Sequence, residues 1–127
     1  MLEPLLFFED LQIAVLLSQS VNMFLFSWFQ TIPLLITGAA IAGLAYSLLF
    51  SLMPSITADF FGVKNLGVNY GLVFTGWGIA GIIGPILGGI AVFKTGTYTM
   101  SYIVAGSLLL IGTVLVKFIK PPVASEI

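Results

Sequence analysis

The sequence predicts an all-α membrane protein with four transmembrane helices. Of its 127 residues, 59% are hydrophobic and only 7% are charged, a composition that ordinary soluble domains do not have. The apolar residues form four runs separated by short polar breaks, and each run is close to or above the roughly 20 residues that cross a bilayer. We predict one unit, 1–127, with spans at about 11–29, 33–53, 66–93 and 98–119.

The first predicted span begins after two acidic residues, Glu9 and Asp10, which we place at a membrane interface. Near its middle lies a polar cluster, which consists of Ser18, Gln19, Ser20 and Asn22. A polar group that faces hydrocarbon goes unsatisfied, so the cluster predicts hydrogen bonds between helices. Contact with a substrate is the alternative interpretation.

The second span follows a very short turn and begins at Pro33, where a proline without its N–H is harmless. Its residues divide into two halves by size when they are placed at about 100° each. Tyr46 lies in the middle of the small half, whose other members are Ala39, Ala40, Ala42, Gly43 and Ser47.

Residues 54–64 form the longest polar break, and we predict a loop there. Phe60 and Phe61 suit the aromatic belt at a membrane surface. Gly62 is a candidate helix C-cap, and Asn65 is a candidate N-cap for the third span.

The third span holds more than half of the chain's fourteen glycines. Each glycine destabilises a soluble helix by roughly 1 kcal/mol relative to alanine, whereas small residues let membrane helices approach closely. Six glycines share one half of the predicted helix with Tyr70, Trp77 and Pro85; they are Gly67, Gly71, Gly78, Gly81, Gly84 and Gly88. This glycine face predicts either close helix packing alone or, in addition, room around Tyr70 and Trp77.

The last span ends near Lys117, Lys120 and two prolines. Four spans place both termini and the loop with Lys64 on one side of the membrane, and only Lys94 on the other. Because basic residues concentrate in cytoplasmic loops, we predict cytoplasmic termini for an integral, multi-pass membrane protein.

The composition excludes several functions. The chain has no cysteine and no histidine, so a thiol nucleophile, a Cys/His metal site and a Ser-His-Asp triad are ruled out. Its five acidic residues are scattered, and four lysines without arginine give no footprint for nucleic acid. We therefore expect no enzymatic activity, catalytic residue, cofactor, metal or nucleic-acid partner.

Three aromatic residues are the candidates for a substrate cavity: Tyr46, Tyr70 and Trp77. No predicted span carries an aspartate, glutamate, arginine or lysine at its centre, so nothing in the chain alone suggests a proton path. Aromatic rings beside small residues near mid-depth can shape a cavity for a small organic substrate, since transporters bind near the membrane midplane. The alternative is that the rings are packing anchors.

The stretch from Pro54 to Gly89 resembles helices ten and eleven of the oxalate/formate antiporter group within the major facilitator superfamily. The motifs are TADFFG (57–62), KN (64–65), NYG (69–71) and GIIGP (81–85). A looser match extends over nearly all of the chain after about residue 11, including the TGTY turn (95–98).

The resemblance implies that the chain is the last third of a twelve-helix transporter, helices nine to twelve, which works by alternating access for a small organic anion. Its partners would be the lipid bilayer, that anion and the N-terminal helices of the same transporter. In the family, helices ten and eleven face the central cavity. The oxalate exchanger has a substrate-binding lysine at about the position of Trp77, so a monocarboxylate is the expected substrate class rather than oxalate.

Two alternatives stay open. The chain could be a self-contained four-helix protein that acts as a dimer, like small multidrug exporters, although their membrane-embedded glutamate has no counterpart here beyond Glu9 and Asp10 at the boundary. It could also be a non-transporting membrane protein whose glycine face packs against a partner.

Overall fold

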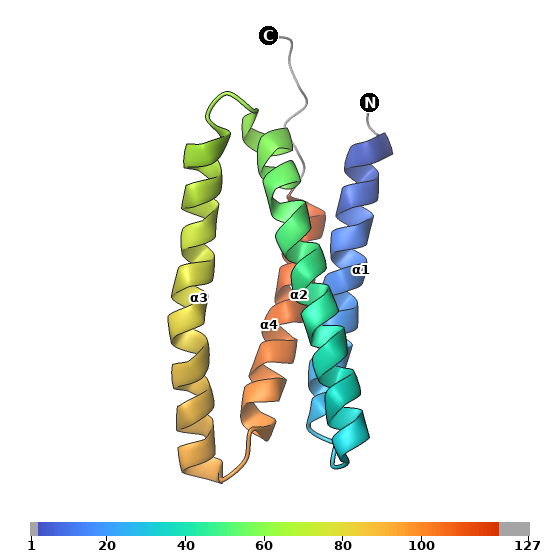
Figure 1. Ribbon diagram of the computed structural model, residues 1–127, viewed down its shortest axis with the longest axis vertical. Coiled ribbons are helices and arrows are strands. Elements are labelled where there is room, and N and C mark those ends of the chain that lie inside the picture. The colour runs from blue at the N-terminus through green and yellow to red at the C-terminus, as the bar shows by residue number, and fades with distance from the viewer. Residues whose placement is uncertain (1–2, 120–127) are drawn as a thin grey trace.

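The computed structural model describes residues 3–119, with side chains from residue 7 onward, and this range contains four helices. They are α1 (Glu3–Phe26), α2 (Ile32–Phe61), α3 (Leu66–Thr95) and α4 (Thr99–Phe118). The helices run alternately up and down, so the start of α1, the end of α4 and the turn between α2 and α3 lie at one end of the molecule (Figure 1). The predicted all-α architecture is confirmed.

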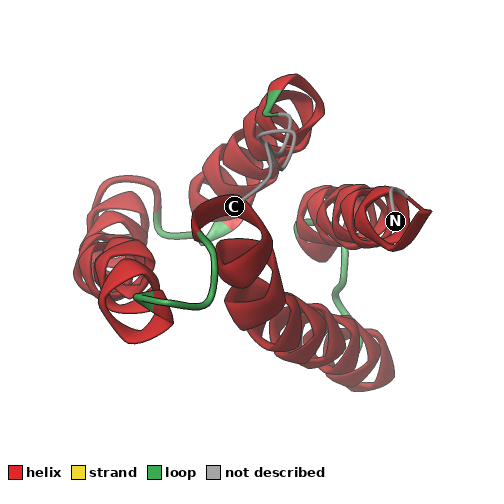
Figure 2. Cartoon of the chain, turned by 90° about the horizontal axis from the view of Figure 1, so that it is seen from above, coloured by secondary structure: helices red, strands yellow, loops and turns green. Residues whose placement is uncertain are grey.

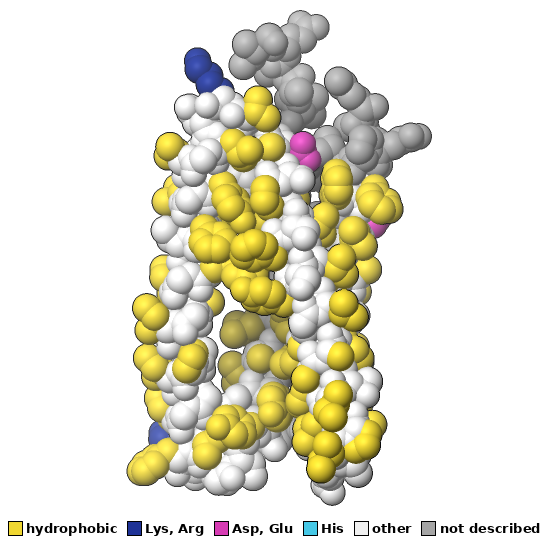
Figure 3. Space-filling view, viewed as in Figure 1, with side chains coloured by type: hydrophobic (Ala, Val, Ile, Leu, Met, Phe, Trp, Pro, Cys, Tyr) yellow, Lys and Arg dark blue, Asp and Glu magenta, His cyan; other side chains and the backbone are white. Residues whose placement is uncertain are grey.

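Three of the helices, α2, α3 and α4, are long and apolar enough to cross a bilayer. On the face drawn in Figure 3, charged side chains lie toward the two ends and apolar side chains cover the length between them. The 24 residues of α1 are also long enough, but Glu9, Asp10 and the polar cluster make this helix less apolar. The chain is therefore a multi-pass membrane protein, and the crossing of α1 stays a prediction.

The helices pack unequally. α1 lies between α4 and α2 and packs most extensively against α4, while α3 touches α2 and α4 over smaller areas. No residue of α3 is buried. Viewed from above, the helices are splayed and do not close into a tight bundle (Figure 2). One long helix thus presents most of its surface outward.

The polar cluster joins α1 to both of its neighbours. Ser20 is fully buried, and its Oγ donates a 2.9 Å hydrogen bond to the Gly106 carbonyl of α4. The Asn22 Nδ2 donates a 3.0 Å hydrogen bond to the Gly38 carbonyl of α2. These two bonds confirm the predicted interhelical role. Ser18 bonds only to a carbonyl of its own helix, that of Val15.

The two glycines that accept these bonds also lie under aromatic rings. A Cβ at Gly38 would stand 2.6 Å from a ring carbon of Phe26 and 2.8 Å from one of Phe29. A Cβ at Gly106 would stand 3.0 Å from the ring of Phe24. Glycine is what lets α1 approach α2 and α4 closely enough for the bonds to form.

The predicted loop at residues 54–64 is wrong over most of its length. α2 continues through Pro54 to Phe61, so Asp59 lies on its last helical turn. Proline removes its own N–H bond and its ring crowds the carbonyl four residues earlier, but a continued helix keeps the other backbone groups satisfied in an apolar medium. Gly62 then ends α2 at φ 74°, with its N–H bonded to the Ala58 carbonyl, as predicted for a C-cap.

The other boundaries differ less. α1 begins at Glu3, ahead of the predicted span, so Glu9 and Asp10 lie within the helix. α3 starts where predicted, although Asn65 makes no side-chain cap bond, and it ends two residues later than expected, at Thr95. Gly96 follows in the left-handed conformation at φ 73°, which turns the chain into α4.

Candidate functional site

Five aromatic rings from α2 and α3 form one cluster, the aromatic cluster, which consists of Tyr46, Phe50, Tyr70, Phe74 and Trp77. Tyr46 and Phe50 are one turn apart on α2, and the other three lie on successive turns of α3, so each helix presents its rings on one side. The cluster is where the loosely packed α3 meets α2. It brings the three predicted cavity residues into one neighbourhood.

Trp77 is the centre of the aromatic cluster. Its ring centroid is 4.9 Å from that of Tyr46 and 5.4 Å from that of Phe50, both in edge-to-face geometry. It stacks nearly parallel to Phe74, with centroids 5.9 Å apart and an angle of 6° between the planes. Such pairs each stabilise by about 0.5–1.5 kcal/mol beyond the burial of their area. The indole is therefore fixed from three sides.

Tyr70 joins the aromatic cluster indirectly. Its ring lies 5.5 Å from that of Phe74, which in turn contacts Trp77. Phe50 and Phe74 are thus the members that sequence reasoning missed. Their spacing was a usable signal, because each follows a predicted tyrosine by four residues, the separation at which side chains on a helix meet.

An open groove of about 590 Å³ lies beside the aromatic cluster, between α2 and α3. We call it the α2–α3 groove. It is lined by Phe50, Pro54, Gly67, Tyr70, Gly71, Phe74 and Thr75. A Cβ at Gly67 or Gly71 would meet nothing within 4 Å, so these glycines leave the groove wide. Its lining carries no charged side chain, and Tyr70 and Thr75 are the residues in it with a hydroxyl group.

The glycine face of α3 is open in the described part of the chain. A Cβ would meet no atom within 4 Å at Gly67, Gly71, Gly78, Gly81 or Gly84, and at Gly88 only Tyr98, at 4.0 Å. The described helices therefore do not pack against this face. Its role in helix packing stays a prediction and requires a surface beyond residues 3–119.

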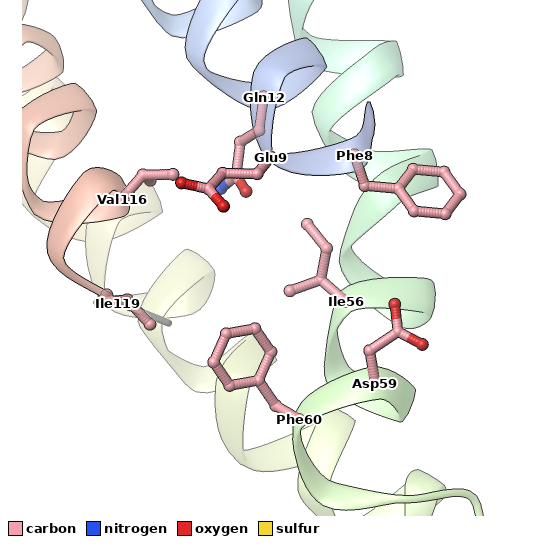
Figure 4. A pocket seen from close by; sticks show the side chains of 8 residues that line it. All are labelled: Phe8, Glu9, Gln12, Ile56, Asp59, Phe60, Val116 and Ile119. Carbon is pink, nitrogen blue, oxygen red and sulfur yellow. The ribbon is translucent and has the colours of Figure 1, made fainter. Parts of the chain in front are cut away.

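A second cavity, of about 130 Å³, lies between α1, α2 and α4 near the end that holds the start of α1. Side chains from the three helices converge on it (Figure 4). Glu9 and Asp59 are far apart in the sequence, yet both line this cavity, because α2 is longer than predicted and carries Asp59 back toward α1. Apolar residues, among them Ile56 and Phe60, complete the wall.

Comparison with known proteins identifies the family. The family model described as Major Facilitator Superfamily matches residues 11–127, which is most of the chain. This chain belongs to the Major Facilitator Superfamily. No solved structure matches it.

This superfamily member is similar to several transport proteins. It is 34% identical over 58 residues to the "Probable sulfoacetate transporter SauU" of Cupriavidus necator, which is 46% of this chain and 14% of that protein. It is 36% identical over 72 residues to human monocarboxylate transporter 14, which is 57% of this chain and 14% of that protein. It is 26% identical over 91 residues to mouse monocarboxylate transporter 12, which is 72% of this chain and 19% of that protein. The chain thus spans less than a fifth of the length of these relatives.

Proposed function

We propose that the chain forms the C-terminal part, helices nine to twelve, of a secondary transporter that carries a small organic anion by alternating access. The observation that supports this most is the α2–α3 groove, an aromatic and glycine-lined surface that no described residue covers. Membership of the Major Facilitator Superfamily supports a transport role, and the transporter names of the relatives support an organic anion.

The proposed substrate class is a small monocarboxylate. Two of the relatives are named as monocarboxylate transporters, which supports this class, whereas the third is named for sulfoacetate, an anion with both a carboxylate and a sulfonate. The aromatic cluster offers ring edges and tyrosine hydroxyls but no cation, so it suits the organic body and a single anionic group better than a dianion. We infer that the residue that pairs with the carboxylate lies on helices outside this chain. We also propose that the chain belongs to the oxalate/formate antiporter group of the superfamily, without oxalate as its substrate.

We propose further that the end with the start of α1 faces the cytoplasm, because two of the three described lysines, Lys64 and Lys117, lie there. The bilayer surrounds the bulky half of α3, and the middle of the glycine face, at Gly78 and Gly81, which line neither cavity, contacts the remaining helices of the transporter. The alternative, a dimeric four-helix protein, uses the same face for a second copy. A stable crosslinked homodimer would favour that alternative.

Substitution of Trp77 tests the proposal. In the full-length carrier, Trp77→Lys should change the affinity or selectivity for organic anions if the ring lines the cavity, because a cation then stands at the centre of the aromatic cluster. The matched control is Trp28→Lys. Trp28 is the other tryptophan of the chain, is 78% exposed and lies in the turn before α2. Unchanged transport kinetics in a normally folded Trp77→Lys variant would mean that the rings are packing anchors only.

A further inference from the structure

A third cavity lies between α3 and α4, at the opposite end of the molecule from Glu9 and Asp59. We call it the α3–α4 cleft; its volume is about 350 Å³. Among the residues that line it are Gly84, Leu87, Gly88, Val104, Ala105 and Leu108, and only its end near the turn is polar. The face of the molecule drawn in Figure 3 is hollowed between α3 and its neighbours. An apolar cleft with one polar end is complementary to an amphiphilic molecule, which has an apolar tail and a polar head.

The dimensions of the α3–α4 cleft match one leaflet of a bilayer. The lining residues on α3 run from Gly84 to Thr95, and at about 1.5 Å per residue the cleft extends roughly 16 Å along the helix. Half of a hydrocarbon core of about 30 Å is about 15 Å. A single acyl chain from the leaflet at this end would therefore lie within the cleft for its whole depth.

The glycines keep the α3–α4 cleft open. A Cβ at Gly84 would meet nothing within 4 Å, and a Cβ at Gly88 would only touch Tyr98 at 4.0 Å. A Cβ at Gly84 thus fits without a clash, and a longer side chain there would take up space in the cleft that Gly84 lines.

The mouth of the α3–α4 cleft is suited to an anion. Lys94, in the last turn of α3, lines it and is exposed. The described acidic residues lie on the first turns of α1 and the last turn of α2, at the other end of the molecule. Charge complementarity at the mouth therefore favours a negative headgroup over a zwitterionic one.

Two further groups at the mouth lack acceptors. The first N–H groups of this 20-residue helix have no intrahelical partner, and the side chain of the N-cap residue Tyr98 does not bond to them. The buried Oγ of Ser101 has no hydrogen-bond partner among the described residues, whereas Ser107 on the same helix bonds back to the Ile103 carbonyl. Phosphate oxygens could accept from both groups, and an unmet buried hydroxyl is unfavourable.

We propose that the α3–α4 cleft binds one anionic phospholipid, with an acyl chain against Gly84 and Gly88 and the phosphate at Lys94 and the start of α4. This site lies at the opposite end from the α2–α3 groove and does not depend on the transported substrate. Its function is to fill the space between two weakly packed helices and so to hold α3 beside α4.

Native mass spectrometry of the 127-residue protein in detergent tests the proposal, with dioleoylphosphatidylglycerol as the probe and dioleoylphosphatidylcholine and inorganic phosphate as comparisons. We expect one phosphatidylglycerol to bind, phosphatidylcholine to bind about fivefold more weakly, and phosphate not to compete, because the acyl chain supplies much of the affinity. Lys94→Gln should weaken phosphatidylglycerol binding about fivefold, whereas Lys64→Gln at the other end should not.

Gly84→Leu tests the acyl-chain part of the site and should abolish most of the binding. Gly89→Leu is its matched control, since Gly89 is also on α3, also has open space around it, and does not line the α3–α4 cleft. Lys94 is exposed, so the Lys94→Gln variant should fold. It therefore tests whether Lys94 binds the anionic headgroup even if the Gly84→Leu variant loses its helical circular dichroism signal. Equal binding of the two lipids, competition by phosphate, or equal effects of variants and controls would overturn the proposal. A homodimer that covers the cleft would overturn it as well.

Discussion

At the scale of single residues, glycine has two different roles in this chain. Gly38 and Gly106 lie under phenylalanine rings and accept hydrogen bonds from α1, whereas the glycine face of α3 meets almost nothing in the described chain. Helical periodicity predicted which residues share a face. It did not predict which face is covered, because that depends on rings such as Phe24 and Phe26 that lie on another helix.

Substitution at Gly38 should separate these two roles. Gly38→Ala places a Cβ 2.6 Å from Phe26 and 2.8 Å from Phe29, so it should lower the free energy of unfolding by about 1–3 kcal/mol. Gly43→Ala on the same helix meets nothing within 4 Å and should be neutral or stabilising by about 0.5–1 kcal/mol. Denaturant titration in detergent measures both. Equal effects of the two variants would mean that α1 does not pack on Gly38 as described.

At the scale of helices, the sequence predicted four helices and most of their ends, but it treated Pro54 as the end of α2. The polar residues after that proline have loop-like composition, yet the helix continues for two more turns, to Gly62. This extension could not be read from composition, because the cost of one missing N–H bond is offset by the bonds that the following residues make. It is also what brings Asp59 to the same cavity as Glu9.

The contact of α3 with α2 should depend on Phe50. Phe50 contacts Tyr46, Phe74 and Trp77, so Phe50→Ala should lower stability by about 1–3 kcal/mol and release Trp77. In a Trp28→Phe background Trp77 is the only tryptophan, and its quenching by acrylamide should increase. Phe93→Ala is the control, because Phe93 is 91% exposed on the same helix as Trp77. Quenching that does not change on removal of Phe50 would argue against the aromatic cluster.

At the scale of the whole molecule, the helices indicate a multi-pass membrane protein, and the family model shows that it belongs to the Major Facilitator Superfamily. Composition and periodicity predicted the membrane class, and the resemblance at 57–62 and 81–85 predicted the superfamily that comparison then identified. The sequence predicted that Tyr46 and Trp77 line the same cavity, but not that their rings are in contact. That contact depends on how closely α2 and α3 approach, which no local pattern specifies.

The orientation in the membrane is testable because the chain contains no cysteine. We expect Val63→Cys, in the turn between α2 and α3, to be protected from an impermeant thiol reagent added outside intact cells. Thr97→Cys, in the turn between α3 and α4, should be labelled, because the two turns lie at opposite ends. The reverse pattern would show that the termini face outward and that the lysine excess is too small to set the topology.

The most direct test of the account is the accessibility of position 77 in the native membrane. If the aromatic cluster lines a substrate path, Trp77→Cys should react with an anionic, membrane-impermeant thiol reagent, and a small monocarboxylate should slow that reaction. Ile82→Cys, on the bulky half of α3, should not react, since lipid surrounds that half. An unreactive Trp77→Cys, or a reaction that no organic anion slows, would contradict the claim that α2 and α3 form the wall of a transport site.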